Sequence, residues 1–129
     1  MEKEKIKIGY VVDGGDAGGA KTHLISFLSR IDKERNDIYV FSLGKGALSN
    51  AVSSLKGVKL FTYPIKSKLD IKIIFTIRNW AVSKNINILH THGIKANLYG
   101  RLASLKLKTP VITTVHSNPL YDYSNIVKG

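Results

Sequence analysis

The stretch that decides the fold spans residues 87–117 and reads NILHTHGIKANLYGRLASLKLKTPVITTVHS. It holds two short apolar runs separated by a segment of helical character. A histidine follows each run, His92 after the first and His116 after the second. In an open α/β sheet, ligands bind beyond the carboxyl ends of the parallel strands, near the point where the strand order reverses. We therefore predict that His92 and His116 belong to one site at that edge.

The rest of the chain repeats this alternation of apolar runs and helical segments. Three earlier strands are predicted over residues 6–12, 37–43 and 58–63. The helix after the first strand carries an apolar face at i, i+4, i+7 and i+8 spacing, made of Ala20, Leu24, Phe27, Leu28 and Ile31. Strands that alternate with helices imply a parallel sheet with right-handed crossovers. The fold class is therefore predicted as α/β, a doubly wound parallel sheet of order 3-2-1-4-5.

Three further helices are predicted over about residues 44–55, 70–84 and 95–107. Asp70 has the side chain of a helix N-cap for the second of them. Gly100, inside the third, most simply permits that helix to pack closely on the sheet.

Composition indicates one globular domain over residues 1–129. The chain is 43% hydrophobic and 22% charged, which suits a folded protein rather than a disordered one. It has no cysteine, which excludes disulfides and thiolate sites. No apolar run approaches the length of a membrane span, and the start MEKEK lacks the apolar region of a signal peptide. We therefore expect a cytoplasmic protein.

The net charge of +11 lies mostly in the second half of the chain. Residues 66–129 contain only two acidic residues, Asp70 and Asp122, against ten lysines and arginines. Such a field favours anionic partners, among them nucleotide phosphates and acidic lipid headgroups. Ordinary solvated lysines would give the same composition, so charge alone does not choose between these interpretations.

The loop after the first strand, residues 13–20, is rich in glycine and reads DGGDAGGA. Glycines let a backbone approach a ligand closely, and the following helix would offer free N–H groups to an anion. The loop matches neither the dinucleotide fingerprint nor the Walker motif, so it could equally be a simple turn. Asp13 and Asp16 would repel a phosphate if they pointed inward.

Two further histidines, His23 and His90, and one lysine, Lys95, are also candidates for site residues. His23 is interpreted as a hydrogen-bonded residue packed under the glycine-rich loop, and His90, in mid-strand, as structural. No metal site is predicted, because no cysteine or acidic residue lies near His90 and His92 in the sequence to complete a ligand set. Lys95 would start a helix at the binding edge, either to meet an anionic substrate group or simply to stay solvated.

Three motifs resemble those of family 4 glycosyltransferases. Residues 18–24 (GGAKTHL) resemble the family's Gly-Gly-Ala-x-x-His-Leu loop and helix. Residues 90–103 (HTHGIKANLYGRLA) are similar to its His-x-His, Lys-Ala and Gly-Arg-Leu-Ala segment, and residues 109–117 (TPVITTVHS) to its Pro-x-x-x-Thr-x-His strand. The three occur in the family's order and cover nearly the whole chain.

The resemblance implies the GT-B architecture, in which two Rossmann-like domains face each other across a cleft, and it implies that this chain is the N-terminal, acceptor-binding one. The family transfers hexose-type sugars, usually with retention and without a metal or other cofactor, from a UDP- or GDP-sugar co-substrate. By match of motif, Gly18 and Gly19 would approach the donor diphosphate and His116 would be catalytic, beside the transferring sugar. His92, Lys95 and Ser117 would line the acceptor side.

The chain departs from the family pattern because the paired glutamates of the C-terminal domain are missing. Its glutamates are Glu2, Glu4 and Glu34. We therefore expect the donor domain to be absent from residues 1–129 and the N-terminal domain to be incomplete at its C-terminal end. The predicted function is the acceptor-binding half of a retaining glycosyltransferase in polysaccharide biosynthesis, inactive alone, acting on a glycan, lipid-linked or small-molecule acceptor.

The alternative is a stand-alone basic module that binds an anionic membrane or polymer. Lys66, Lys68 and Lys72 flank a helix whose apolar residues are Ile73, Ile74, Phe75, Ile77 and Trp80, a pattern that interfacial helices show. A core-facing amphipathic helix explains the same pattern and is preferred. Peripheral contact with the inner face of the membrane is compatible with either function. No nucleic-acid partner is predicted, because no nucleic-acid-binding motif occurs.

Overall fold

The computed structural model describes residues 5–65, 71–105, 107 and 109–114. Within them, five strands alternate with four helices. The strands are β1 (Ile6–Asp13), β2 (Asn36–Leu43), β3 (Val58–Tyr63), β4 (Ile88–His92) and β5 (Val111–Thr114). The helices are α1 (Gly19–Arg30), α2 (Ala47–Ser53), α3 (Lys72–Ser83) and α4 (Ile94–Ser104).

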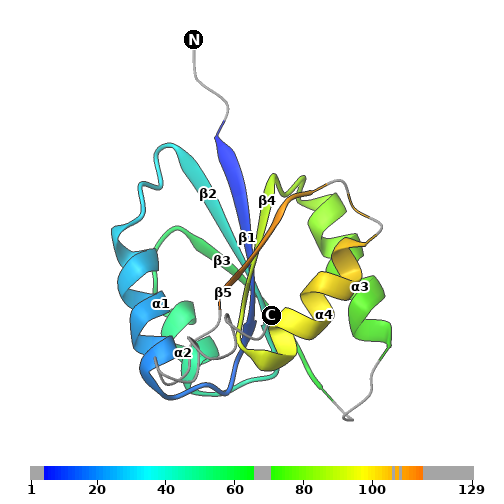
Figure 1. The fold of residues 1–129 in the computed structure, drawn as a ribbon. Helices are drawn as coiled ribbons and strands as arrows, with labels where there is room; N and C mark the ends of the chain where they lie inside the picture. The colour runs from blue at the N-terminus through cyan, green and yellow to red at the C-terminus, as the bar shows by residue number, and fades with distance from the viewer. Residues whose placement is uncertain (1–4, 66–70, 106, 108, 115–129) are drawn as a thin grey trace, which may run out of the picture.

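The strands form one parallel sheet of order β3-β2-β1-β4-β5, which confirms the predicted order. β1 is the central strand and pairs in parallel with both β2 and β4. The strand order reverses between β1 and β4, where Val12 lies opposite His92. Figure 1 shows the two helical layers, with α1 and α2 on one side of the sheet and α3 and α4 on the other.

Two hydrophobic clusters fill the space between the sheet and its two helical layers. Alternate residues of a strand point to opposite faces, so neighbours in β1 divide between the clusters. Tyr10 and Val12 pack with the α1–α2 layer, whereas Val11 packs with the α3–α4 layer. This division explains the long apolar runs of β1 and β2, because strands covered on both faces have no solvent side.

The burial of α1 differs from the sequence expectation at one residue, whereas the burial of α3 agrees with it. Leu24 and Leu28 of α1 are buried as predicted, but Phe27 is 47% exposed, so the predicted apolar face is too wide. The apolar residues of α3 lie mainly in the core: Ile73, Ile77 and Trp80 are at most 7% exposed. The core-facing interpretation of that helix is therefore confirmed. The predicted N-cap, Asp70, lies outside the described residues.

Gly100 places α4 against the sheet, as predicted. A Cβ atom at this position would lie 2.3 Å from the Cγ2 methyl of Thr91 in β4. Thr91 is fully buried, and its hydroxyl is hydrogen-bonded to the hydroxyl of Thr113 in β5 at 3.2 Å. The close approach of α4 to β4 thus depends on the absence of a side chain at position 100.

Candidate functional site

The loops that follow β1 and β4 meet at the carboxyl edge of the sheet, where the strand order reverses. The β1–α1 loop carries Gly18 and Gly19, and β4 ends in His92 immediately before α4. Because Val12 and His92 are direct neighbours in the β1–β4 ladder, the structure brings these two predicted parts of the site together. His116 and Ser117 lie outside the described residues.

His92 is a buried residue, with 2% of its surface exposed. By the alternation of β4 it shares a face of the sheet with His90, and the two ring centroids lie 6.4 Å apart. His90 in turn stacks on the ring of Tyr10 with 5.0 Å between centroids. This stacking fits the structural role predicted for His90.

Asp13, the last residue of β1, caps the N-terminus of α4. Its carboxylate accepts hydrogen bonds from the backbone N–H of Ala96 at 3.0 Å and of Lys95 at 3.3 Å. Burial raises the pKa of the Asp13 carboxyl above its ordinary value, whereas these hydrogen bonds and the charge of Lys95 act to lower it. Asp13 thus binds the neighbouring helix, a role that its place in a glycine-rich loop did not indicate.

Gly14 joins the β1–α1 loop to the β2–α2 connection. Its carbonyl accepts hydrogen bonds from the N–H groups of Leu48 and Ser49, in the first turn of α2. A Cβ atom on Gly14 would lie 2.0 Å from the carbonyl oxygen of Gly44. The first glycine of the loop is therefore needed for packing, which accounts for part of the glycine content noted in the sequence.

The N-terminus of α1, where Gly18 and Gly19 lie, is more open. The N-cap residue is Gly18, no side chain caps the helix, and its first turn contains no acidic residue. The carboxylate of Asp16 accepts a hydrogen bond from the N–H of Gly18 at 2.8 Å. A Cβ atom on Gly19 would meet nothing within 4 Å. Of the two helices that flank the reversal point, α4 is capped by Asp13 and α1 has no side-chain cap.

Lys95 and His23 are both exposed, and exposure agrees with the expectation only for Lys95. Lys95 has an exposed side chain at the start of α4, beside the edge of the sheet. His23 is also exposed, so the interpretation that it packs under the glycine-rich loop is wrong. Across the described residues, no group of three or more histidine, aspartate and glutamate side chains could hold a metal ion.

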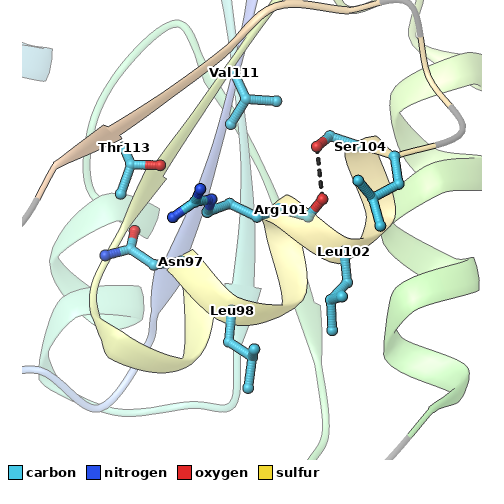
Figure 2. A pocket seen from close by; sticks show the side chains of 8 residues that line it. Asn97, Leu98, Arg101, Leu102, Ser104, Val111 and Thr113 are labelled. Atoms are coloured by element: carbon cyan, nitrogen blue, oxygen red, sulfur yellow. Dashed lines mark hydrogen bonds between the residues drawn. The ribbon is translucent and has the colours of Figure 1, made fainter. Parts of the chain in front are cut away.

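A surface pocket of about 790 Å³ lies along α4 and β5 (Figure 2). Arg101 and Asn97 of α4 face Val111 and Thr113 of β5 across it. The pocket contains none of the predicted site residues, so the site is assigned to the edge of the sheet by the position of its residues and not by this cavity.

Comparison with known proteins identifies the family. The model of glycosyltransferase family 4 matches residues 17–128, which is most of the chain. The chain belongs to glycosyltransferase family 4. No protein in the set of curated sequences matches it.

The fold matches part of a solved GT-B glycosyltransferase. HepE of Anabaena in complex with UDP superposes with a TM-score of 0.68 at 18% identity, over 86% of this chain and 29% of HepE. HepE with UDP and glucose gives 0.63 at 21% identity, over 90% of this chain and 32% of HepE. The chain thus spans about a third of HepE, and the likeness at this identity shows the fold.

None of the described helices is long and apolar enough to cross a membrane.

Proposed function

We propose that this chain is the acceptor-binding half of a retaining, cytoplasmic glycosyltransferase, the N-terminal domain of a GT-B enzyme that is inactive without its donor domain. The observation that supports it is the family 4 match across residues 17–128, together with the pairing of β1 and β4, in which His92 lies opposite Val12 near the glycine-rich loop. HepE was crystallised with UDP, which favours a nucleotide-sugar as donor.

The open N-terminus of α1 suits the proposed donor diphosphate. Glycosyl transfer builds up negative charge on the departing phosphates, and helix N-terminal amides stabilise such charge. Gly18 and Gly19 are exposed, and a Cβ atom on Gly19 would meet nothing within 4 Å. The N–H of Gly18 is bonded to the carboxylate of Asp16, so the amides proposed to meet the phosphates are those of Gly19 and the residues that follow it in the first turn. In this proposal the diphosphate binds at α1, because the carboxylate of Asp13 occupies the corresponding position on α4.

The acceptor side is proposed to comprise Lys95, His92 and Ser117, with His116 beside the transferring sugar. Lys95 is exposed and can meet a polar or anionic acceptor group directly. His92 is 2% exposed, so its contribution is to support the turn at Gly93 that carries Lys95. A histidine in the position proposed for His116 can orient a hydroxyl of the sugar or exchange a proton with it.

The proposal is tested by assaying transfer and donor hydrolysis with UDP- and GDP-sugars, with and without EDTA. This chain alone is expected to show neither, while a longer protein that includes the donor domain transfers sugar.

In that longer protein, His116→Ala should lower turnover by about 10²-fold or more with little change in Tm. Gly19→Val should weaken donor binding, and Gly15→Val, in the same loop, is its control. Robust transfer by this chain alone, or none by the longer protein with any donor, would contradict the proposal.

Contact with an anionic membrane is proposed as an accessory property of the same enzyme. Residues 71–114 contain no acidic residue at all. On α3 and its N-cap, the apolar side chains that the core leaves exposed are Ile71 at 68%, Phe75 at 47% and Val82 at 60%. Arg78 lies over the ring of Phe75 at 5.1 Å, so charge and apolar surface occur together. Lys66 and Lys68 of the original hypothesis lie outside the described residues.

Sedimentation with vesicles of phosphatidylglycerol and phosphatidylcholine tests this contact. Binding should fall with added salt, because exposed charges are screened, and should weaken in Phe75→Ser. Phe27→Ser is a matched control, since Phe27 is also 47% exposed but lies on α1, on the other side of the sheet. Equal loss in both variants, or equal binding to vesicles of phosphatidylcholine alone, would count against the contact.

A further inference from the structure

We propose that Asp13 is a positioning residue of the site: its carboxylate holds the start of α4, and with it His92 and Lys95, in a fixed relation to the β1–α1 loop. This inference rests on the proposed function for its effect on catalysis, but not for the structural link itself. Asp13 lies at the end of β1, and the amides that it binds come 82 and 83 residues later in the chain.

The side chain that caps α4 comes from a different element, and this distinguishes the role of Asp13 from ordinary stabilisation of a helix. A helix is usually capped by the side chain of its own N-cap residue, or aided by an acidic residue in its first turn. α4 has neither, because its N-cap is Gly93 and its first turn contains no acid. The capping group comes instead from another strand, so the bonds that complete the helix also join the two loops across the reversal point.

The turn between β4 and α4 fits closely around this carboxylate. Gly93 has a φ of 114°, which side-chain-bearing residues rarely adopt. A Cβ atom on Gly93 would lie 2.5 Å from Oδ2 of Asp13. The turn that connects His92 to Lys95 is therefore both conformationally restricted and in direct contact with Asp13, so a displacement of the carboxylate would displace the turn.

The substitution Asp13→Asn tests the contact between the Asp13 carboxylate and the start of α4, because asparagine keeps the shape of the side chain and removes its charge. The amide oxygen of asparagine can accept one of the two backbone hydrogen bonds, but its NH₂ group would face the second backbone N–H, and two donors cannot bond each other. Asp16→Asn is the matched control, because Asp16 lies in the same loop and its removal also deletes one negative charge. The carboxylate of Asp16 binds Gly18, within the loop, and not α4.

The first test is ¹H–¹⁵N NMR of the full chain as a function of pH. In the wild type, the amide signals of Lys95 and Ala96 should titrate together with a midpoint above the ordinary pKa of an aspartate side chain. The charged groups that act on Asp13 are Lys95 and Asp16, so the titration is repeated in Asp16→Asn, where it should persist. Asp13→Asn should abolish it and should also shift the ring signals of His92 and the amides of residues 15–19.

If Lys95 and Ala96 do not titrate in the wild type, the Asp13 carboxylate does not bind the start of α4, and the inference is overturned. If Asp13→Asn alters these two amides alone, Asp13 is a helix cap without a positioning role, which also overturns it. The second test measures kinetics in the longer enzyme. At saturating donor, Asp13→Asn should lower kcat/KM for the acceptor by roughly 10- to 100-fold, the scale of a small misplacement of reacting groups. Unchanged acceptor kinetics would overturn the inference. A wild-type enzyme without transferase activity would instead overturn the proposed function, and the NMR result would still decide the link.

Discussion

The contact between Gly100 and Thr91 allows a quantitative test of how α4 is held on the sheet. In Gly100→Ala, the new methyl group would lie 2.3 Å from Cγ2 of Thr91, whereas carbon atoms in favourable contact are about 3.5–4.0 Å apart. The overlap exceeds an ångström, and both Gly100 and Thr91 are buried. Overpacking of this kind costs about 1–3 kcal/mol, and alanine recovers about 1 kcal/mol of helix propensity relative to glycine. Because the overlap is this large, we expect a cost at the upper end of that range, about 3 kcal/mol, and therefore a net loss of about 2 kcal/mol in the free energy of unfolding.

A second substitution tests the cause. Thr91→Ser removes the methyl group but keeps the hydroxyl that is hydrogen-bonded to Thr113. The nearest remaining atoms to the alanine Cβ would be Cβ of Thr91 at 3.5 Å and Cβ of Val11 at 3.9 Å, which are ordinary contacts. In the Thr91→Ser background, Gly100→Ala should therefore be neutral or stabilising, with a coupling energy of about 2–3 kcal/mol.

Urea unfolding followed by the fluorescence of Trp80, which packs in the same cluster as α4, measures all four proteins. If the two substitutions are additive within about 0.5 kcal/mol, the cost of Gly100→Ala does not arise from the Thr91 methyl, and the reasoning is refuted.

Two further predictions concern the same edge and the core beneath it. Gly14→Ala should destabilise the chain by about 2 kcal/mol or more, because the rigid carbonyl of Gly44 cannot move away from the new methyl group. Gly15→Ala, where a Cβ atom meets nothing within 4 Å, should change stability by no more than about 0.5 kcal/mol, and similar losses in both would contradict the packing described. Burial raises the pKa of Tyr10 to about 12, so between pH 10 and pH 12 the unfolded state ionises while the folded state keeps its proton, and stability should fall as pH rises. Urea unfolding across this range should show a shallower decline in Tyr10→Phe than in the wild type, and identical slopes would argue against the raised pKa.

The topology could be predicted from the sequence because each strand is a short apolar run bounded by turn residues, and right-handed crossovers leave few arrangements of five such strands. The ends of β3 were predicted to the residue, since Gly57 and Pro64 bound it. The prediction that Phe27 lies in the core is wrong. Helical spacing gives the angular position of a residue around the helix axis, but it does not say whether another element packs against the helix at that angle. The angular position of Phe27 lies near that of Leu24, yet Leu24 is 3% exposed and Phe27 47%, so the buried face of α1 ends between these two positions.

The site could be predicted only in part, because its decisive contacts join residues that are distant in the chain. The predicted strand order placed the loop that carries Gly18 and the strand end at His92 at one edge, and the pairing of β1 with β4 brings those segments together. The link from Asp13 to α4 could not be predicted from the sequence around α4. Gly93 has no side chain that could cap the helix, and the first turn of α4 contains no acidic residue. An indirect clue was available: a helix with a glycine N-cap and no acid in its first turn needs a capping group from elsewhere.

The central place of β1 has a consequence for synthesis. β1 leaves the ribosome before the other four strands of this sheet, yet one of its two edges is completed only by β4, which ends at His92. At about 5–20 residues per second, the intervening stretch of about 80 residues takes roughly 4–16 s to translate. During that interval the open edge of an apolar strand can pair with another chain. Nascent chains released before residue 92 would keep this edge open, and aggregation should therefore be concentrated among them.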